Sequence, residues 1–262
     1  MSATGTAELM EAVESVARLA GAHALGLFQR DLEVETKGDG SPVTAADRGA
    51  ESLARDWIVA RYPEDGIEGE EFGITRPEAR RRWILDPIDG TKSFVRGVPL
   101  WGTLVAVAEG TRVLAGAAFC PAVGELAVAG ESEGCWWNGV RCHVSTAASL
   151  SSATVLATDE RMAGQARKRE GWQRLAGRAA IVRTWGDCYG YLLVATGRAE
   201  VMTDPRMAAW DSAAVAPLIT EAGGVFTDWR GVSTAFGRDA IATNAALAAE
   251  VRHLLGVPIV DA

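Results

Sequence analysis

Two aspartates, a proline and a glycine directly follow a short apolar run in the first half of the chain. Residues 82–85 read Arg-Trp-Ile-Leu and predict a buried strand, after which the sequence continues Asp86-Pro87-Ile88-Asp89-Gly90-Thr91. A proline fixes one backbone angle and a glycine permits an unusual one, so both carboxylates and the intervening carbonyl can turn toward one point. The motif therefore places two negative charges at the end of a core strand.

Oxygen atoms of this kind are the ligands that Mg²⁺ and Mn²⁺ prefer in proteins. Thr91 predicts the cap of a short following helix, whose first amides, those of Gly90 and Thr91, would be free to receive an anion. An isolated Asp-x-x-Asp-Gly is also typical of an ordinary acidic turn that closes a strand. The motif alone therefore leaves both interpretations open.

Two further acidic segments favour the metal site. Gly69-Glu70-Glu71 precedes the motif, and Trp210-Asp211 stands where a later helix is predicted to begin. Carboxylates from three separate segments, each at the end of an element, are expected for a metal cluster and are hard to explain as surface charge. The three segments together predict a site held by oxygen ligands.

In order and spacing, residues 69–71, 86–91 and 210–211 resemble the signatures of the inositol monophosphatase family of metal-dependent phosphatases, and the match covers nearly the whole chain. Three further runs resemble most the bacterial histidinol-phosphate phosphatase branch: residues 91–94, 99–102 and 185–191. The resemblance implies an α+β fold, a layered α-β-α-β-α sandwich. It would carry an antiparallel sheet in the N-terminal half and a second, mixed sheet in the C-terminal half.

Periodicity divides the chain into two unequal halves of one domain over residues 1–262, at about 1–148 and 149–262, with the site between them. Apolar positions predict helices over 7–30 and from about 45 to 62, joined by a turn-rich loop at 35–42. Strands are expected at 103–107, 113–119 and 125–128, and the paired tryptophans at 136–137 in a following hairpin are read as core. The second half alternates, with strands at 154–157, 180–183, 200–203, 224–227 and 240–243, and helices at 160–176, 189–196, 212–222 and 245–255.

Composition excludes several functions. The net charge of −8 and pI near 5.0 argue against nucleic acid as a partner, and the basic run at 76–82 is read as a solvated turn. The three histidines share no spacing typical of a zinc site, and the four cysteines form no Cys-x-x-Cys pair, which predicts reduced, buried thiols. No signal-like start or long apolar run occurs, so we expect a cytoplasmic protein without a membrane span.

The resemblance also implies roles for the acidic residues. The metal ligands would be Glu70, Asp86, the Ile88 carbonyl, Asp89 and Asp211, with Glu71 contributing to a weaker ion. Two or three Mg²⁺ ions are implied, and Mn²⁺ accepts the same oxygens. Hydrolysis would then use a water activated by the ions, without a covalent phosphoenzyme.

Four residues N-terminal to or within the motif receive catalytic or binding roles through the same resemblance. Asp47 would pair with Thr91 to orient and deprotonate the attacking water, with Glu70 beside them. Taken alone, Asp47 is an acid in the first turn of a helix, where it favours the helix dipole. Lys37 would reach the active site from its loop, although a solvated loop lysine is the ordinary alternative.

Substrate choice is predicted from the residues where the family places its alcohol-binding pocket: Trp185, Asp187, Tyr189 and Asp204. Histidinol phosphate carries an ammonium and a partly protonated imidazole, which the two carboxylates should attract. The ring could stack on Trp185, Tyr189 or Trp101, and Gly90 and Thr91 would bind the phosphate. Acids and aromatics at element ends are also common without such a role.

These inferences lead to a Mg²⁺-dependent phosphomonoesterase that hydrolyses L-histidinol phosphate, in histidine biosynthesis. An inositol-1-phosphate or fructose-1,6-bisphosphate phosphatase is the alternative within the family, and a nucleotide 3′-phosphatase a further one. A catalytically silent binding protein would lack at least one metal carboxylate, and none is missing here. The family resemblance implies a homodimer.

Overall fold

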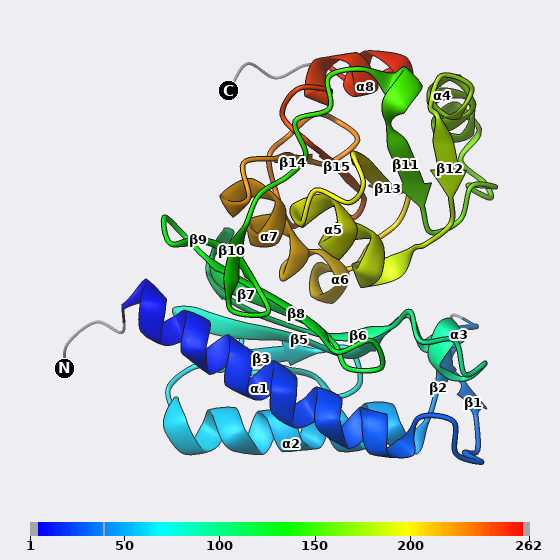
Figure 1. Ribbon diagram of the computed structural model, residues 1–262. Coiled ribbons are helices and arrows are strands. Elements are labelled where there is room, and N and C mark those ends of the chain that lie inside the picture. Colours follow the sequence, from blue (N-terminus) through cyan, green and yellow to red (C-terminus); the bar gives the residue numbers. More distant parts are fainter. Residues whose placement is uncertain (1–4, 39, 259–262) are drawn as a thin grey trace.

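Helices and sheets alternate through the molecule in the computed structural model, which describes residues 5–38 and 40–258 (Figure 1). Two N-terminal helices, α1 (Thr6–Leu27) and α2 (Ala45–Arg61), cover one face of a first sheet. The layer between the other face of this sheet and a second sheet contains α5 (Asp187–Ala195), α6 (Ala209–Ser212) and α7 (Val215–Glu221). The outer face of the second sheet is covered by α4 (Ala166–Ala176) and α8 (Ala248–Leu255). This order confirms the predicted layered α+β sandwich.

The first helix forms because its apolar residues recur every three or four positions. Leu9, Val13, Val16 and Ala20 lie on one face of α1 and are almost completely buried against the sheet. The predicted helix over 7–30 ends earlier, at Leu27, and Gln29 has a left-handed backbone (φ 59°) that no helix continues.

The predicted loop at 35–42 contains a small hairpin. Its two-residue strands β1 (Glu35–Thr36) and β2 (Pro42–Val43) pair antiparallel, with Glu35 opposite Val43. Residue 39 lies outside the described residues. Thr44, the N-cap of α2, directly follows the hairpin, so the loop holding Lys37 is closed by the paired strands and continues into a helix.

Eight strands form the first sheet in the described residues, in the order β10-β9-β8-β7-β6-β5-β3-β4. Most neighbours run antiparallel, as predicted, but β3 is parallel to β5, so the sheet is mixed. The strands are β3 (Gly66–Gly69), β4 (Gly73–Thr75), β5 (Arg81–Asp89), β6 (Gly102–Glu109), β7 (Arg112–Cys120), β8 (Glu125–Gly130), β9 (Gly134–Trp137) and β10 (Val140–Cys142). The parallel pair brings the Glu70 segment beside the end of β5.

The second sheet is mixed, as predicted, with the order β12-β11-β13-β15-β14 in the described residues. Its central strand β13 is parallel to β11 and antiparallel to β15. The strands are β11 (Thr154–Ala157), which follows a 3-10 turn at Leu150–Ser152, β12 (Ile181–Arg183), β13 (Val201–Asp204), β14 (Val225–Thr227) and β15 (Ala240–Thr243).

Two predicted helices of the second half differ most from the observed ones, whereas the helix expected over 245–255 only begins three residues later, at Ala248. The helix expected over 160–176 begins only at Ala166, after a turn region. The helix expected over 212–222 is divided into α6 and α7. Pro217 has no N–H to donate to the carbonyl four residues earlier, so the first helix cannot continue regularly into the second.

Apolar side chains fill the space between each pair of layers. Alternate residues of the second sheet point to opposite faces, so Leu156 packs toward α5 and α7 whereas Val155 packs toward α4 and α8. Trp137 packs, half-buried, against the apolar side chains between the two sheets, and Trp136 against those between the first sheet and α1 and α2, which agrees with their interpretation as core residues. All four cysteines are free and buried, as predicted. Within the described residues no helix is both long and apolar enough to cross a bilayer.

Candidate active site

The end of β5 bends where the predicted motif lies. Asp86 pairs with Leu104 of β6 and Asp89 with Gly102, so three steps on one strand face two on the other, which is a β-bulge. The Thr103 hydroxyl donates to the Pro87 carbonyl at 2.8 Å and fixes the bulge. Beyond it, Gly90 has a left-handed φ of 83°, and the short helix α3 (Thr91–Phe94) follows.

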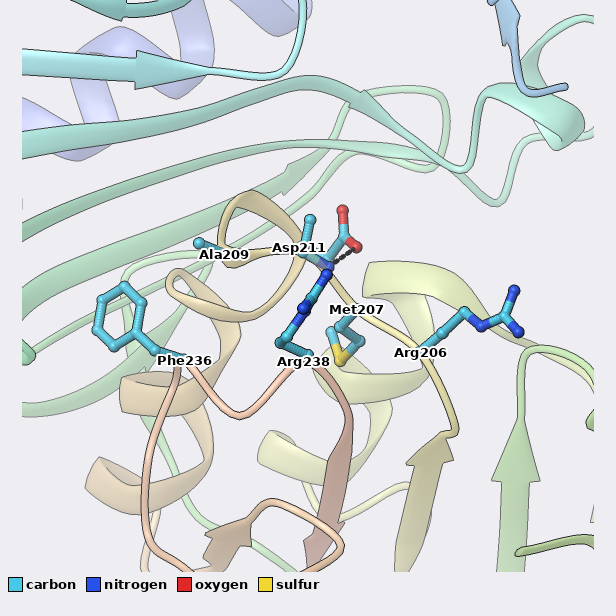
Figure 2. Close-up of a pocket in the computed structure, with 7 residues that line it drawn as sticks. Arg206, Met207, Ala209, Asp211, Phe236 and Arg238 are labelled. Atoms are coloured by element: carbon cyan, nitrogen blue, oxygen red, sulfur yellow. Dashed lines mark hydrogen bonds between the residues drawn. The ribbon is translucent and has the colours of Figure 1, made fainter. Parts of the chain in front are cut away.

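A cluster of three carboxylates forms at this bend. Asp86, Asp89 and Asp211 each offer one oxygen, and these oxygens all lie within 4.8 Å of one another. Asp211 comes from α6, where the Ala208 amide donates to its Oδ2 at 2.7 Å (Figure 2). The Asp89 Oδ2 accepts the Cys188 amide at the start of α5. The carboxylate cluster therefore joins the two halves of the chain.

Burial disfavours the ionised form of the three carboxyls in this cluster. It raises the pKa of Asp86 and of Asp89 well above the ordinary value, and neighbouring carboxylates raise them further. The pKa of Asp211 is raised to about 6, mainly by burial and against the lowering effect of the Ala208 amide. A divalent cation would remove this repulsion, and an all-oxygen donor set suits Mg²⁺ or Mn²⁺ rather than a softer metal.

Lys37 reaches the predicted glutamates from the small hairpin. Its Nζ donates to Glu70 Oε1 at 2.7 Å and to Glu71 Oε1 at 2.6 Å. Burial alone would lower the pKa of Lys37, but these two hydrogen bonds outweigh it and raise the pKa above its ordinary value. The Glu70 amide in turn donates to the Leu85 carbonyl, next to Asp86. Lys37, Glu70 and Glu71 therefore lie together beside the carboxylate cluster.

Asp47 and Thr91 are not hydrogen-bonded to each other, in contrast to the pairing implied by the family resemblance. The Thr91 hydroxyl donates to the Ile88 carbonyl at 2.9 Å. Asp47 Oδ2 accepts both the amide and the hydroxyl of Thr44, at 2.8 and 2.7 Å, while its buried Oδ1 has no partner. Burial raises the pKa of Asp47, although the Thr44 hydrogen bonds oppose this. Thr44 lies three residues before Asp47, and its hydrogen bonds to this carboxylate were not predicted.

A small cavity of about 70 Å³ extends from the cluster toward the predicted alcohol pocket. Asp187 lines it, and burial raises the pKa of this carboxyl to about 6. Asp204 also lines it, but its Oδ2 accepts the Tyr191 hydroxyl at 2.9 Å, and burial raises its pKa to about 8. Asp204 is therefore largely neutral near pH 7, so of the two predicted acids only Asp187 offers a charge there.

Three aromatic residues were predicted as stacking partners for a substrate ring, and their surroundings differ. Tyr189 donates its hydroxyl to Glu125 of β8 at 3.0 Å and does not line the small cavity. Trp101 is fully buried and packs against Phe94, with ring centroids 4.9 Å apart. Only Trp185 is exposed to solvent, and Arg183 lies near its ring face. The Tyr189 hydroxyl is thus engaged by Glu125 and the Trp101 ring is enclosed in the core, which leaves Trp185 as the exposed ring of the three.

Two arginines that the sequence did not single out line a larger cavity of about 780 Å³ next to Asp211. Figure 2 shows Arg238 extending toward Asp211 and Arg206 pointing away from it. Arg206 also lines the small cavity, together with Thr158. Neither arginine stands in a recognisable sequence motif. Arg206 precedes α6 and Arg238 precedes β15, so the two become neighbours of the cluster only in the folded chain.

Comparisons with known proteins agree on one family. The model of the inositol monophosphatase family matches residues 6–256. A histidinol-phosphatase from Chlorobaculum parvum is 44% identical over 86% of this chain and 87% of its own length. A histidinol-phosphatase from Mycobacterium tuberculosis is 40% identical over 84% of this chain and 87% of its own. The solved structure of an inositol monophosphatase from Zymomonas mobilis superposes with a TM-score of 0.86 at 29% identity, and covers 98% of this chain and all of that one.

Proposed function

We propose, because this chain belongs to the inositol monophosphatase family of phosphatases, that it hydrolyses L-histidinol phosphate to L-histidinol and phosphate. The observation that carries the catalytic part is the carboxylate cluster, in which oxygens of Asp86, Asp89 and Asp211 lie within 4.8 Å. The substrate part rests on the relatives named histidinol-phosphatase, which match most of this chain, and on the acidic small cavity.

The proposed metal ligands are the carboxylate cluster, Glu70 and the Ile88 carbonyl, with Glu71 contributing to a further ion. Mg²⁺ bound there would polarise the phosphate ester and lower the pKa of an attacking water. The unpartnered Oδ1 of Asp47 is a candidate acceptor for a proton of that water, with Thr91 helping to orient it. Gly90 and Thr91 would hold the phosphate through their amides, and Lys37 would neutralise part of its charge.

Asp187 is the residue we assign to the cationic end of the substrate. Its Oδ2 lies beside Gly90, only 3.1 Å from where a β-carbon on that glycine would stand. A group bound near Asp187 would therefore also be near the proposed phosphate site. The ammonium of histidinol phosphate satisfies this arrangement.

A sugar bisphosphate is the second candidate, and a specific observation favours it. Arg206 and Arg238 line the cavity next to Asp211, where they would attract a second phosphate rather than a cation. The same family chemistry serves both candidates. The choice depends on whether the substrate extends toward Asp187 or toward the arginines.

Phosphate release in the presence of Mg²⁺ from a parallel set of substrates tests the proposal. The set contains histidinol phosphate, inositol-1-phosphate, fructose-1,6-bisphosphate and adenosine 3′,5′-bisphosphate. We expect kcat/KM for histidinol phosphate to exceed the others by about a hundredfold or more, roughly 2.7 kcal/mol of discrimination. Asp89→Asn should abolish release while leaving the fold intact. A preference for fructose-1,6-bisphosphate would assign the arginine cavity instead, and full activity of the variant would contradict the metal site.

We further propose that the two halves of the chain form a single domain with one active site between them, and that the protein is a cytoplasmic homodimer. Four free, buried cysteines fit a reducing compartment. Residues of both halves supply the cluster, since Asp86 and Asp89 end β5 and Asp211 lies on α6. The family resemblance supports the dimer, and the mass of the protein in solution would test it.

A further inference from the structure

A glutamate on α2 lies beneath the turn that carries the predicted metal glutamates. Glu51 is completely buried, and its Oε2 accepts the Glu71 amide at 2.7 Å. Its Oε1 accepts the Phe72 amide at 3.2 Å. Both amides lie in the turn between β3 and β4, and Glu51 supplies their acceptors from the buried side of that turn.

The approach of Glu51 to this turn requires the glycine before the glutamates. A β-carbon on Gly69 would lie 2.0 Å from Glu51 Oε1, so no other residue fits there without moving the carboxylate. On its other side, Gly69 pairs with Leu85 of β5. The turn is thus held between a strand that leads to Asp86 and a carboxylate from α2.

Arg55 completes the support one helical turn later. Its Nε donates to Glu51 Oε1 at 2.7 Å, and its Nη2 donates to the Gly73 carbonyl beyond the turn. The guanidinium also lies near the Phe72 ring, 5.9 Å from its centroid. The Glu51–Arg55 ion pair therefore accepts hydrogen bonds from two amides of this turn and donates one to the Gly73 carbonyl.

We propose that Glu51, supported by Arg55, is a positioning residue that aims Glu70 and Glu71 at the divalent-cation site. The inference rests on the proposed function, since that function requires the site. Glu51 contacts neither substrate nor reacting atoms and acts through the backbone of residues 70–72. Glutamine at this position presents an NH₂ group to donors, so at least one of the three hydrogen bonds is lost and the turn moves.

The chain offers a matched control at the opposite end of β3. Asp65 is also buried and paired with an arginine, Arg81, at 2.7 Å, the same separation as in the Glu51–Arg55 pair. Its Oδ2 also accepts the indole N–H of Trp83, in the core. Asp65→Asn therefore removes a comparable buried ion pair without touching the turn that carries Glu70.

The test is a Mn²⁺ titration of the full chain followed by electron paramagnetic resonance, which needs no substrate. Loss of a residue that orients a ligand typically lowers metal affinity 10–100-fold, and we expect about that loss for Glu51→Gln. Asp65→Asn should bind Mn²⁺ as the wild type does. Gly69→Ala, which displaces the carboxylate from the other side, should reproduce the Glu51→Gln result.

Two outcomes would overturn the assignment: unchanged Mn²⁺ affinity in Glu51→Gln, or an equal loss in Asp65→Asn. If Glu51→Gln does not fold, as judged by circular dichroism, Arg55→Lys decides, because it keeps the charge but loses the grip on Gly73. Normal Mn²⁺ affinity in that variant would then refute the proposal. A wild-type protein that binds Mn²⁺ but releases no phosphate would refute the proposed function and leave the role of Glu51 testable.

Discussion

Asp187 adopts a conformation that few non-glycine residues accept. Its φ is 51°, and its amide donates to the Thr158 hydroxyl at 2.9 Å at the start of α5. Aspartate and asparagine tolerate the left-handed region better than most residues. The conformation turns the carboxylate toward Gly90, which makes Asp187 the residue where substrate choice is best tested.

We expect Asp187→Asn to raise the KM for histidinol phosphate more than the KM for a neutral phosphate ester. Asparagine keeps the shape and tolerates the same φ, but it removes the charge that would attract an ammonium. Near pH 7 the carboxyl is mostly ionised, since its pKa is about 6, so the charge is present to be lost. Steady-state kinetics with both esters gives the two ratios. Equal increases for both would remove the case for cation recognition by Asp187.

At the residue scale the sequence predicted the groups whose chemistry is local. The run from Asp86 to Thr91 carries its ligands within six positions, and its bulge follows from Pro87 and Gly90. Glu51 and Arg206 stand in no such run and reach the site only through tertiary contacts. Asp204 was predicted as a charge, but its burial, which sequence spacing does not predict, raises its pKa to about 8 although hydrogen bonds with Thr158 and Tyr191 oppose this.

The N-terminus of α2 shows how an element holds a catalytic candidate. Thr44 caps the helix: its hydroxyl accepts the Ala46 amide at 3.1 Å and donates to Asp47, whose side chain returns to the Thr44 amide. This capping box leaves Asp47 Oδ1 as the one free oxygen of a buried carboxyl. Asp47 therefore belongs to the helix cap through Oδ2 and is the proposed proton acceptor through Oδ1.

Thr44→Ala should lower both stability and activity. Loss of an N-cap costs about 0.5–2 kcal/mol, and the hydrogen bond to Asp47 is lost with it. Thermal unfolding and phosphate release measure the two effects. Thr44→Ser, which keeps the hydroxyl, should restore most of both. An alanine variant with reduced stability but full turnover would separate the cap from the function of Asp47.

At the element scale, periodicity predicted most helices and strands but not their partners. The parallel pairing of β3 with β5 was missed because no strand was predicted over the four residues of β3. The break between α6 and α7 was missed because the apolar pattern continues through it, although Pro217 lies within that span. Both features place acidic residues at the site, Glu70 in one case and Asp211 in the other.

At the scale of the whole molecule, folding gathers acids that would repel one another in water. The carboxylate cluster, Asp187 and Asp204 come from both halves, and burial raises the pKa of each of these five residues. The metal-free fold therefore carries an electrostatic cost near neutral pH that bound cations would relieve. The layered architecture concentrates this cost at the junction of its halves.

A pH-dependent stability without metal follows from these raised pKa values. An unfolded aspartate has a pKa of about 3.9, so in mildly acidic solution the unfolded chain has released protons that the folded chain retains. The free energy of unfolding must then fall as the pH rises, because the folded state binds more protons. The fall starts above about pH 4 and continues through about 6, the pKa of Asp187 and Asp211, to about 8, that of Asp204.

Thermal unfolding in a chelator should therefore show a melting temperature that drops by several degrees between about pH 5 and about pH 8, since 1 kcal/mol shifts Tm by roughly 2–4 °C in a chain of about this size. Mg²⁺ binds ionised carboxylates and should restore more stability at the higher pH. Asp204→Asn removes the acid with the pKa of about 8 without altering the carboxylate cluster, and should flatten the upper part of the profile while keeping the Mg²⁺ effect. A melting temperature that rises over this range in chelator, or a Mg²⁺ effect equal at both ends, would contradict a repulsive metal-free cluster.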